Sequence, residues 1–273
     1  RQIAERHEIL RTTFVHRPGI RIPLQAVADD LEPALEIRHL DAEPEPGDTA
    51  TLLAGERATP LNLEDGPLLR ALLLSNAADR HLLMITLSSL CADASSMTAL
   101  AAELAHQLGA GGPPLEDPLQ YADFAAWQAE LAQADDPQAL AAREAWSELA
   151  SLSSPVLPFT GRRSPGQALD EVSVELPTGA GSAIVQAAWH VLLSRLTGEQ
   201  RVVVPYLSPE RPHDDLEGAI GAFARPVPIA IVIDGAASFA SFAASSDLRA
   251  AMRAESIRLI CPAPMPTVAQ SFA

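Results

Sequence analysis

The apolar and polar positions of the chain alternate between helical and strand periods. Apolar residues recur at helical spacing over residues 3–10, whereas residues 81–87 form an apolar run typical of a buried, central strand. Residues 97–108 return to the helical period and predict a helix directly after that strand. Ser95 or Ser96 is the expected N-cap, because a hydroxyl there accepts a backbone N–H that the first helical turn leaves unpaired.

Strands and helices interleave in both halves of the chain, which predicts a mixed fold of the α/β or α+β class. Further predicted helices cover residues 51–59, 119–131, 139–149 and 184–196. Further predicted strands cover residues 20–27, 35–40, 68–74, 171–176, 202–206 and 227–233. A stretch rich in serine, proline and glycine over 151–166 predicts a boundary between an N-terminal lobe, residues 1–160, and a C-terminal lobe, residues 161–273.

Charge and cysteine content narrow the range of partners. The 273 residues carry a net charge of −16, and every basic side chain apart from histidine is arginine. An acidic chain is repelled by polyanions, so we expect neither nucleic acid nor membrane as a partner. The two cysteines, Cys91 and Cys261, form no disulfide or metal-binding pattern, which predicts a cytoplasmic protein without a metal.

A short polar loop, residues 88–96, follows the apolar run and contains Ser88, Ser89, Asp93 and Ser96. Loops that join a strand to a helix often carry function, because the rigid elements on either side position them. The simpler interpretation of this loop is an ordinary capped helix start. Local sequence alone leaves both interpretations open.

Five stretches, in this order along the chain, resemble the condensation domains of nonribosomal peptide synthetases. Residues 6–14, RHEILRTTF, resemble the RHExLRTxF motif, and residues 61–74, LNLEDGPLLRALLL, resemble the DLxxGPLxR segment. Residues 121–128, YADFAAWQ, resemble the YxDFAxWQ motif, and residues 157–163 resemble the linker between the two lobes of that family. Residues 216–228, LEGAIGAFARPVP, are similar to the IGxFVNT motif.

The resemblance implies two lobes, each like a chloramphenicol acetyltransferase subunit, arranged as a V-shaped pseudo-dimer with a central tunnel. It also implies that donor and acceptor carrier proteins deliver thioesters on phosphopantetheine arms, and that an amide bond forms in the tunnel. The phosphopantetheine belongs to the carriers, so the domain itself is expected to bind no cofactor. Adjoining synthetase domains are the other expected partners.

The signature of the family, HHxxxDG, is altered in this chain. Aligned on Asp93, residues 88–94 read SSLCADA, so Ser88 and Ser89 replace the two histidines. A serine hydroxyl cannot take up a proton near neutral pH as an imidazole can. The resemblance implies a structural role for Asp93 through an arginine, for which Arg6, Arg11 and Arg225 are the candidates.

Three interpretations of the altered loop stay open. In the first, the domain forms amide bonds by positioning, with Ser88, Ser89 or Ser96 orienting the amine. In the second, it is related to heterocyclization domains, whose DxxxxDxxS motif it matches at Asp93 and Ser96. In the third, it is a noncatalytic docking domain. A nucleophilic role for Cys91 is the weaker alternative to simple inward packing.

Two aromatic or basic positions have a second possible role. Tyr121, Phe124 and Trp127 lie at i, i+3 and i+6, a spacing for which core packing is the favoured explanation. Trp127 is nevertheless a candidate for the tunnel wall. Arg225 stands where the family motif has asparagine, and it is a candidate for neutralising an acidic substrate.

The chain is also shorter than the family pattern. The first motif of the family is absent, and residues 176–184 and 236–273 are compressed relative to it. We therefore expect a fragment, with residues missing near 178–182 and 244–247.

Overall fold

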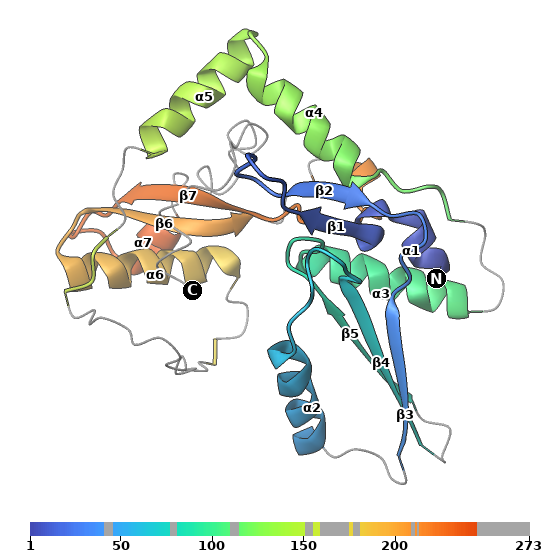
Figure 1. The fold of residues 1–273 in the computed structure, drawn as a ribbon. Coiled ribbons are helices and arrows are strands. Elements are labelled where there is room, and N and C mark those ends of the chain that lie inside the picture. Colours follow the sequence, from blue (N-terminus) through green and yellow to red (C-terminus); the bar gives the residue numbers. More distant parts are fainter. Residues whose placement is uncertain are drawn as a thin grey trace. The chain divides into compact units, whose positions relative to one another are not determined.

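The computed structural model describes residues 1–40, 46–76, 81–109, 115–150, 155–158, 175–176, 181–208, 211 and 213–244. They form a mixed α/β fold, as the interleaved pattern predicts (Figure 1). The chain divides into two compact units, one made of Arg1–Trp127 and Pro209–Ala224 and the other of Gln128–Ser208 and Arg225–Ala273. Most of the linker predicted over 151–166 lies outside the described residues, so the lobes 1–160 and 161–273 stay a prediction.

The first unit contains most of the described helices and strands. Its helical elements are α1 (Gln2–Arg6), η1 (Glu8–Arg11), α2 (Pro46–Ala58), α3 (Ala94–Leu108), η2 (Asp214–Leu216) and the start of α4 (Tyr121–Gln133). Its strands are β1 (Thr12–Val15), β2 (Leu24–Val27), β3 (Ala34–Leu40), β4 (Leu69–Asn76) and β5 (His81–Leu87). Strands β1 and β2 form an antiparallel hairpin, and a second sheet has the order β3-β4-β5.

Strand β5 matches its predicted bounds, but among the described strands it is neither central nor fully buried. It pairs antiparallel with β4 and lies at the edge of the sheet formed by the described strands. Met84 lies opposite Leu72 on the face that packs against Leu52 of α2, whereas Leu83, on the other face, is 41% exposed. That second face is covered in part, because Ile85 and Leu87 pack against the core of the first unit whereas Leu83 is exposed.

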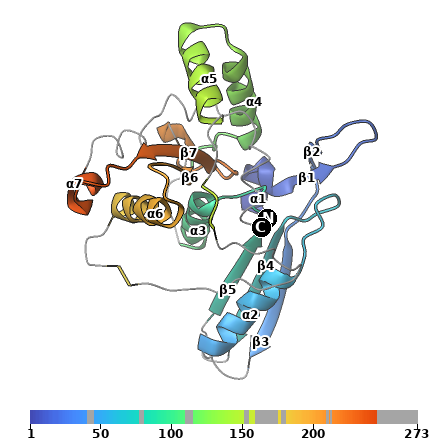
Figure 2. The same ribbon diagram turned by 90° about the vertical axis from the view of Figure 1, so that its left-hand side faces the viewer.

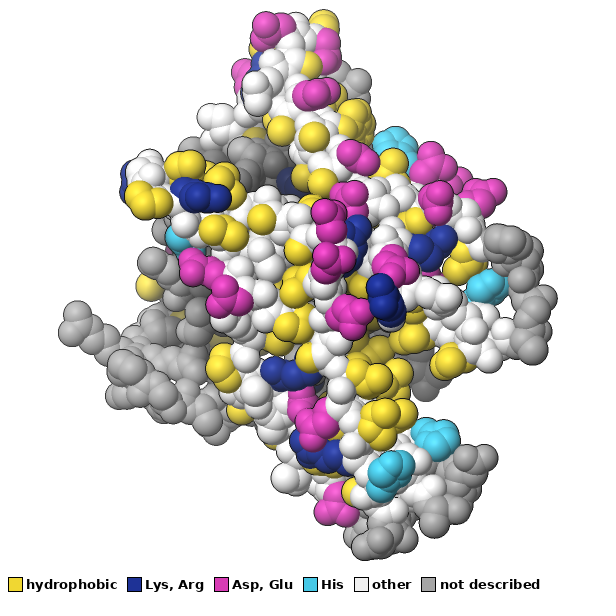
Figure 3. All heavy atoms as spheres, turned by 45° about the vertical axis from the view of Figure 1, so that its right-hand side comes forward, with side chains coloured by type: hydrophobic (Ala, Val, Ile, Leu, Met, Phe, Trp, Pro, Cys, Tyr) yellow, Lys and Arg dark blue, Asp and Glu magenta, His cyan; other side chains and the backbone are white. Residues whose placement is uncertain are grey.

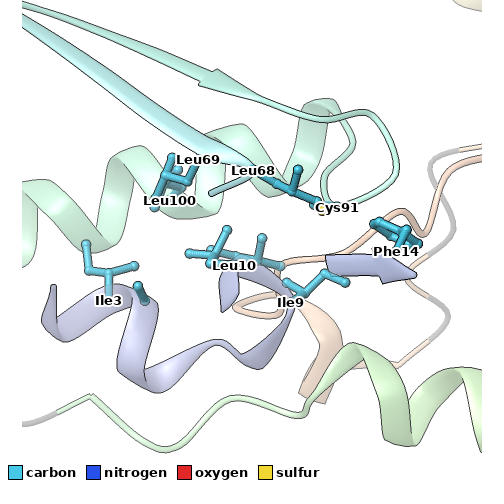
Figure 4. Packing of buried hydrophobic residues seen from close by; sticks show 10 residues of the cluster. Ile3, Ile9, Leu10, Phe14, Leu68, Leu69, Cys91 and Leu100 are labelled. Carbon is cyan, nitrogen blue, oxygen red and sulfur yellow. The ribbon is translucent and has the colours of Figure 1, made fainter. Parts of the chain in front are cut away.

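The core of the first unit joins the N-terminal elements to α3. Leu10 of η1 and Phe14 of β1 are buried against Leu68, Cys91 and Leu100, the last of which belongs to α3 (Figure 4). This packing fixes the middle of α3 against the N-terminal elements. The loop that enters α3 is consequently held by a rigid frame.

The described residues of the second unit form a two-stranded antiparallel sheet covered by a helix. It contains the end of α4, α5 (Pro137–Ala150), α6 (Ser182–Thr197), β6 (Arg201–Ser208), β7 (Arg225–Val232) and α7 (Phe239–Ala243). Both ribbon views show α6 alongside β6 and β7 (Figure 2), and Leu193 of α6 packs on Val202 and Val204. Helix α6 ends at Thr197, and its C-cap Gly198 has the left-handed conformation with φ 78°. The strand predicted over 171–176 and the breaks predicted near 178–182 and 244–247 lie largely outside the described residues.

Candidate functional site

The loop between β5 and α3 ends at an aspartate that caps the helix. Asp93 is the N-cap of α3, and its Oδ1 accepts the backbone N–H of Ser96 at 2.7 Å. The prediction of Ser95 or Ser96 as N-cap is therefore wrong. Both serines lie inside the first turn, whereas Asp93 has the extended backbone (φ −100°, ψ −178°) that directs a carboxylate back to the free N–H groups.

A buried ion pair holds this carboxylate. The Nη2 of Arg211 lies 3.2 Å from Oδ1 of Asp93, and the two side chains are 11% and 6% exposed, respectively. Burial lowers the pKa of Arg211, and the negative charge of Asp93 acts in the opposite direction. A guanidinium stays charged under all conditions in which proteins fold, so the carboxylate keeps a permanent counter-ion.

The arginine paired with Asp93 is thus not one of the three predicted candidates. Arg6 donates from Nε to Glu103 at 2.8 Å, and Arg11 donates to two backbone carbonyls at 2.9 and 2.6 Å. Arg225 donates to the side chain of Gln128. The sequence did not predict the role of Arg211, because this residue lies in a proline-rich loop. In such a loop no periodicity indicates which side chains point inward.

Ser96 occupies the centre of the network around Asp93. Its Oγ is fully buried and lies 2.8 Å from both Oδ1 of Asp93 and the carbonyl oxygen of Gly221. The same oxygen accepts the N–H of Gly221 and an N–H of Arg211, each at 3.0 Å. A hydroxyl has one hydrogen and two lone pairs, so these contacts use its full capacity. The geometry gives Ser96 a supporting position and leaves no lone pair for a substrate.

The network extends to the strap, a name used here for residues 213–224. The N–H of Ala224 donates to Oδ2 of Asp93 at 3.0 Å, and the N–H of Asp93 donates to the carbonyl of Gly221 at 3.1 Å. Phe223 is fully buried beneath the guanidinium carbon of Arg211, at 4.4 Å from the ring centroid. Hydrogen bonds, an ion pair and an aromatic ring therefore hold the strap to the entrance of α3.

The aromatic stripe of α4 supports the strap from a second direction. Tyr121 meets Phe223 edge-on at 5.2 Å, and Phe124 is buried against the same ring at 5.0 Å. Trp127 is 39% exposed and contacts His213 at 5.7 Å between ring centroids, so core packing explains Phe124 but not the whole stripe. The role of Trp127 in a tunnel wall stays a prediction.

The two serines at the positions of the missing histidines differ in their surroundings. Ser88 is 9% exposed, and its Oγ accepts the backbone N–H of Leu90 at 3.3 Å. Ser89 is exposed, and its hydroxyl has no hydrogen-bond partner within the described part of the chain. Of the four predicted catalytic candidates, Ser89 alone combines exposure with an uncommitted hydroxyl. Its catalytic role, like that of Ser88, stays a prediction.

Neither the nearby thiol nor the buried histidines offer a substitute base. Cys91 is fully buried, and burial raises the pKa of its thiol to about 12, which agrees with the inward-packing interpretation. The buried His7 lies 2.7 Å from Glu103, and burial lowers its pKa below the usual value. His190 contacts the carbonyls of Gln186 and Ile229 in the core of the second unit.

The described residues contain neither a metal-ligand cluster nor a membrane-spanning helix. No group of three or more histidine, cysteine or acidic side chains there is arranged to hold a metal ion. None of the described helices combines the length and apolarity that a membrane-spanning helix needs. On the face shown in Figure 3, the arginines of the described residues are scattered among acidic side chains and form no continuous basic patch.

Residues 1–257 match the model of the family described as "Condensation domain". The chain belongs to the condensation-domain family. It is 32% identical over 258 residues to tyrocidine synthase 3 of Brevibacillus parabrevis, an alignment that covers 88% of this chain and 4% of that protein. It is also 32% identical over 266 residues to phosphinothricin tripeptide synthetase of Streptomyces viridochromogenes, covering 87% and 24%. The resemblance to condensation domains of nonribosomal peptide synthetases is thereby confirmed.

Solved structures support the same family. The X-domain from teicoplanin biosynthesis matches with a TM-score of 0.75 and 26% identity over 95% of this chain and 62% of that one. A solved complex of the X-domain and OxyB from teicoplanin biosynthesis matches with a TM-score of 0.68 and 25% identity, covering 96% and 62%. This chain thus spans less than two thirds of the solved chains and a small part of the curated synthetases. The mixed α/β class is confirmed, whereas the V-shaped arrangement and the tunnel stay predictions.

Proposed function

We propose that this chain acts as a condensation domain of a nonribosomal peptide synthetase and joins acyl and aminoacyl thioesters through an amide bond without an imidazole. The family match over residues 1–257 supports the reaction class. The observation that carries the proposal is the exposed hydroxyl of Ser89, which lies next to the frame around Asp93. This frame binds Arg211, Ser96 and the strap, and it presents an exposed Ser89 beside a rigid helix entrance.

The chemistry requires positioning more than a strong base. The acceptor amine attacks the thioester carbonyl, the amine loses a proton, and the carrier thiol leaves. Without a general base the rate falls roughly 10²–10⁴-fold, whereas holding the two reactants together supplies an effective molarity of roughly 10⁵–10⁸ M. In this proposal the hydroxyl of Ser89 accepts a hydrogen bond from the amine, Ser88 supports the loop, and the proton passes to water.

Condensation domains act within multidomain synthetases together with carrier-protein domains, whose phosphopantetheine holds the substrates. For this chain we propose a donor carrier, an acceptor carrier and adjoining synthetase domains as partners. The domain binds no cofactor or metal of its own in this proposal. Its proposed location is the cytoplasm.

The test incubates the intact protein with loaded donor and acceptor carriers and follows the product by mass spectrometry. We expect an amide product, a lower rate for Ser89→Ala, and a rate raised by roughly 10²–10⁴-fold for Ser89→His, which restores a base. Absence of product above background for the wild type and for both variants contradicts the proposal. A product lighter by one further water assigns the domain to heterocyclization instead.

A noncatalytic recruiting domain is the second candidate. Two observations favour it, namely the loss of both histidines and the similarity to the X-domain, which has been solved in complex with OxyB. This candidate predicts no product from the wild type or from Ser89→Ala. It also predicts that a partner enzyme of the same biosynthetic route binds this domain saturably. Titration calorimetry would measure that binding. Carrier-dependent product from the wild type contradicts it.

A further inference from the structure

Three polar side chains of the second unit meet where β6 ends and β7 begins. Ser208 and Arg225 are directly opposite one another in the antiparallel register, so their side chains share one face of the sheet, with Cβ atoms about 5 Å apart. The guanidinium of Arg225 donates to Oε1 of Gln128, in the middle of α4. The same face carries Val202 and Val204 against α6, which places this polar group at the end of an apolar layer.

Two atoms of this group are buried without a partner. Ser208 is fully buried and Gln128 is 5% exposed, yet Ser208 Oγ and Gln128 Nε2 make no hydrogen bond within the described part of the chain. Folded proteins leave few buried polar atoms in that state, and each one costs about 1–3 kcal/mol. Rotating the Gln128 amide does not help, because it would turn an N–H towards the guanidinium, which only donates.

We infer that Arg225, Gln128 and Ser208 form a recognition site for a carboxylate group on the substrate. The three side chains offer a guanidinium fork, an amide N–H and a hydroxyl, all of them able to donate. A carboxylate has two oxygens with about four acceptor positions, so it can accept from the amide and the hydroxyl together, while the guanidinium beside them supplies the opposite charge. Arg225 is partly exposed and connects the buried pair to the surface.

The inference deepens the proposed function, on which it rests, by naming a substrate class. A condensation domain with this site acts on an acyl or aminoacyl thioester that carries a free carboxylate. A neutral carbonyl would satisfy only one or two of the donors. The phosphate of a carrier arm is a second source of anionic oxygens, so the test separates the two.

The experiment measures equilibrium binding to the intact protein by titration calorimetry, which requires no turnover. The carboxylate probe is succinyl-pantetheine, which has a free carboxylate and no phosphate. The matched neutral probe is the same thioester with a terminal amide, and inorganic phosphate is a separate competitor. We expect the carboxylate probe to bind at least about 10-fold more tightly than the amide, since charged hydrogen bonds contribute the difference. Phosphate is expected not to displace it.

Three variants locate the site. Arg225→Asn should bring the two probes to equal affinity, and Ser208→Ala should weaken the carboxylate probe several-fold while raising the Tm of the free protein, because it removes an unpaired buried hydroxyl. Arg201→Asn, at the exposed opposite end of β6, should change neither value. Should Arg225→Asn fail to fold, Arg225→Lys keeps the charge but loses the fork, and it should narrow the difference between the probes.

Equal affinity of the two probes for the wild type overturns the inference, as does a difference that survives Arg225→Asn. Displacement by phosphate assigns the site to a carrier arm and overturns the carboxylate assignment. A Tm lowered by Ser208→Ala means that the hydroxyl is already satisfied and also counts against the site. Because binding is measured without turnover, the binding experiment tests the carboxylate site even if the domain is catalytically inactive. Likewise, amide formation from neutral substrates alone refutes the inference and preserves the proposed function.

Discussion

Replacing Arg211 by methionine tests whether the buried ion pair with Asp93 holds the strap against α3. Methionine keeps an unbranched apolar stem over Phe223 and removes the charge. Removing one partner of a buried pair generally costs about 3–5 kcal/mol, because the remaining charge is left without compensation. Asp93 keeps donors from Ser96 and from Ala224, so we expect the lower end, about 3 kcal/mol. That corresponds to a roughly 100-fold larger population with the strap detached.

Amide hydrogen exchange measures this population locally. The N–H groups of Gly221 and Ala224 bind Ser96 and Asp93, so their exchange reports detachment of the strap directly. We expect these two amides to exchange roughly 100-fold faster in Arg211→Met, in line with the free energy above. Amides in the interior of α6 belong to the second unit and should be unchanged.

Two further variants make the result decisive. Arg201→Met removes an exposed arginine from the start of β6 and should leave exchange of the strap at the wild-type rate. Asp93→Ala combined with Arg211→Met removes the uncompensated charge, so the double variant should lose less stability than the sum of the single variants. Unchanged exchange of the strap in Arg211→Met would refute the reasoning. A strictly additive double variant would show that the two side chains act independently.

Three more predictions concern buried groups of the first unit. Burial lowers the pKa of His7 below 6.5, so His7 binds a proton more readily in the unfolded chain than in the folded protein. The urea midpoint should therefore fall as the pH drops below about 6.5. His7→Gln should remove that dependence. A Cβ at Gly221 would lie 2.3 Å from Cδ2 of Tyr121, so Gly221→Ala should destabilise by about 1–3 kcal/mol in urea, whereas Gly218→Ala, with open space around its Cβ, should not. With the other cysteine replaced by serine, Cys91 should resist iodoacetamide at pH 8 until urea unfolds the protein, as mass spectrometry would show.

Local pattern predicted the elements around the site well. Strand β5 has its predicted bounds, and α3 begins three residues earlier than predicted because the cap is Asp93. Periodicity identifies a helix but does not choose among adjacent polar residues for its cap. That choice depends on which residue has an extended backbone, and this is fixed only when the loop is held from outside.

The local sequence pattern could not predict which residues far apart in the chain bind one another. Arg211 and Asp93 are 118 residues apart, and nothing in the spacing of either indicates the other. Asp93 and Gly221 belong to two separate family motifs in the sequence. That the hydroxyl of Ser96 joins them is shown only by the structure. The exposure of Trp127 could not be predicted from the sequence either. Helical spacing places Trp127 on the same side of the helix as Phe124, but it does not show where the buried part of that side ends.

The contacts of the loop explain how its chemistry can change while its fold does not. Ser89 is exposed, so its identity contributes little to folding, whereas Ser88 is buried and its side chain accepts one backbone N–H at 3.3 Å. Asp93 and Ser96 are different, because each binds several groups of the strap and of α3. A substitution at 89 therefore alters the proton chemistry at a free energy cost far below that of losing Asp93. It follows that an intact frame is compatible with either proposed function, and that the decisive measurement is the response of turnover to a base placed at position 89.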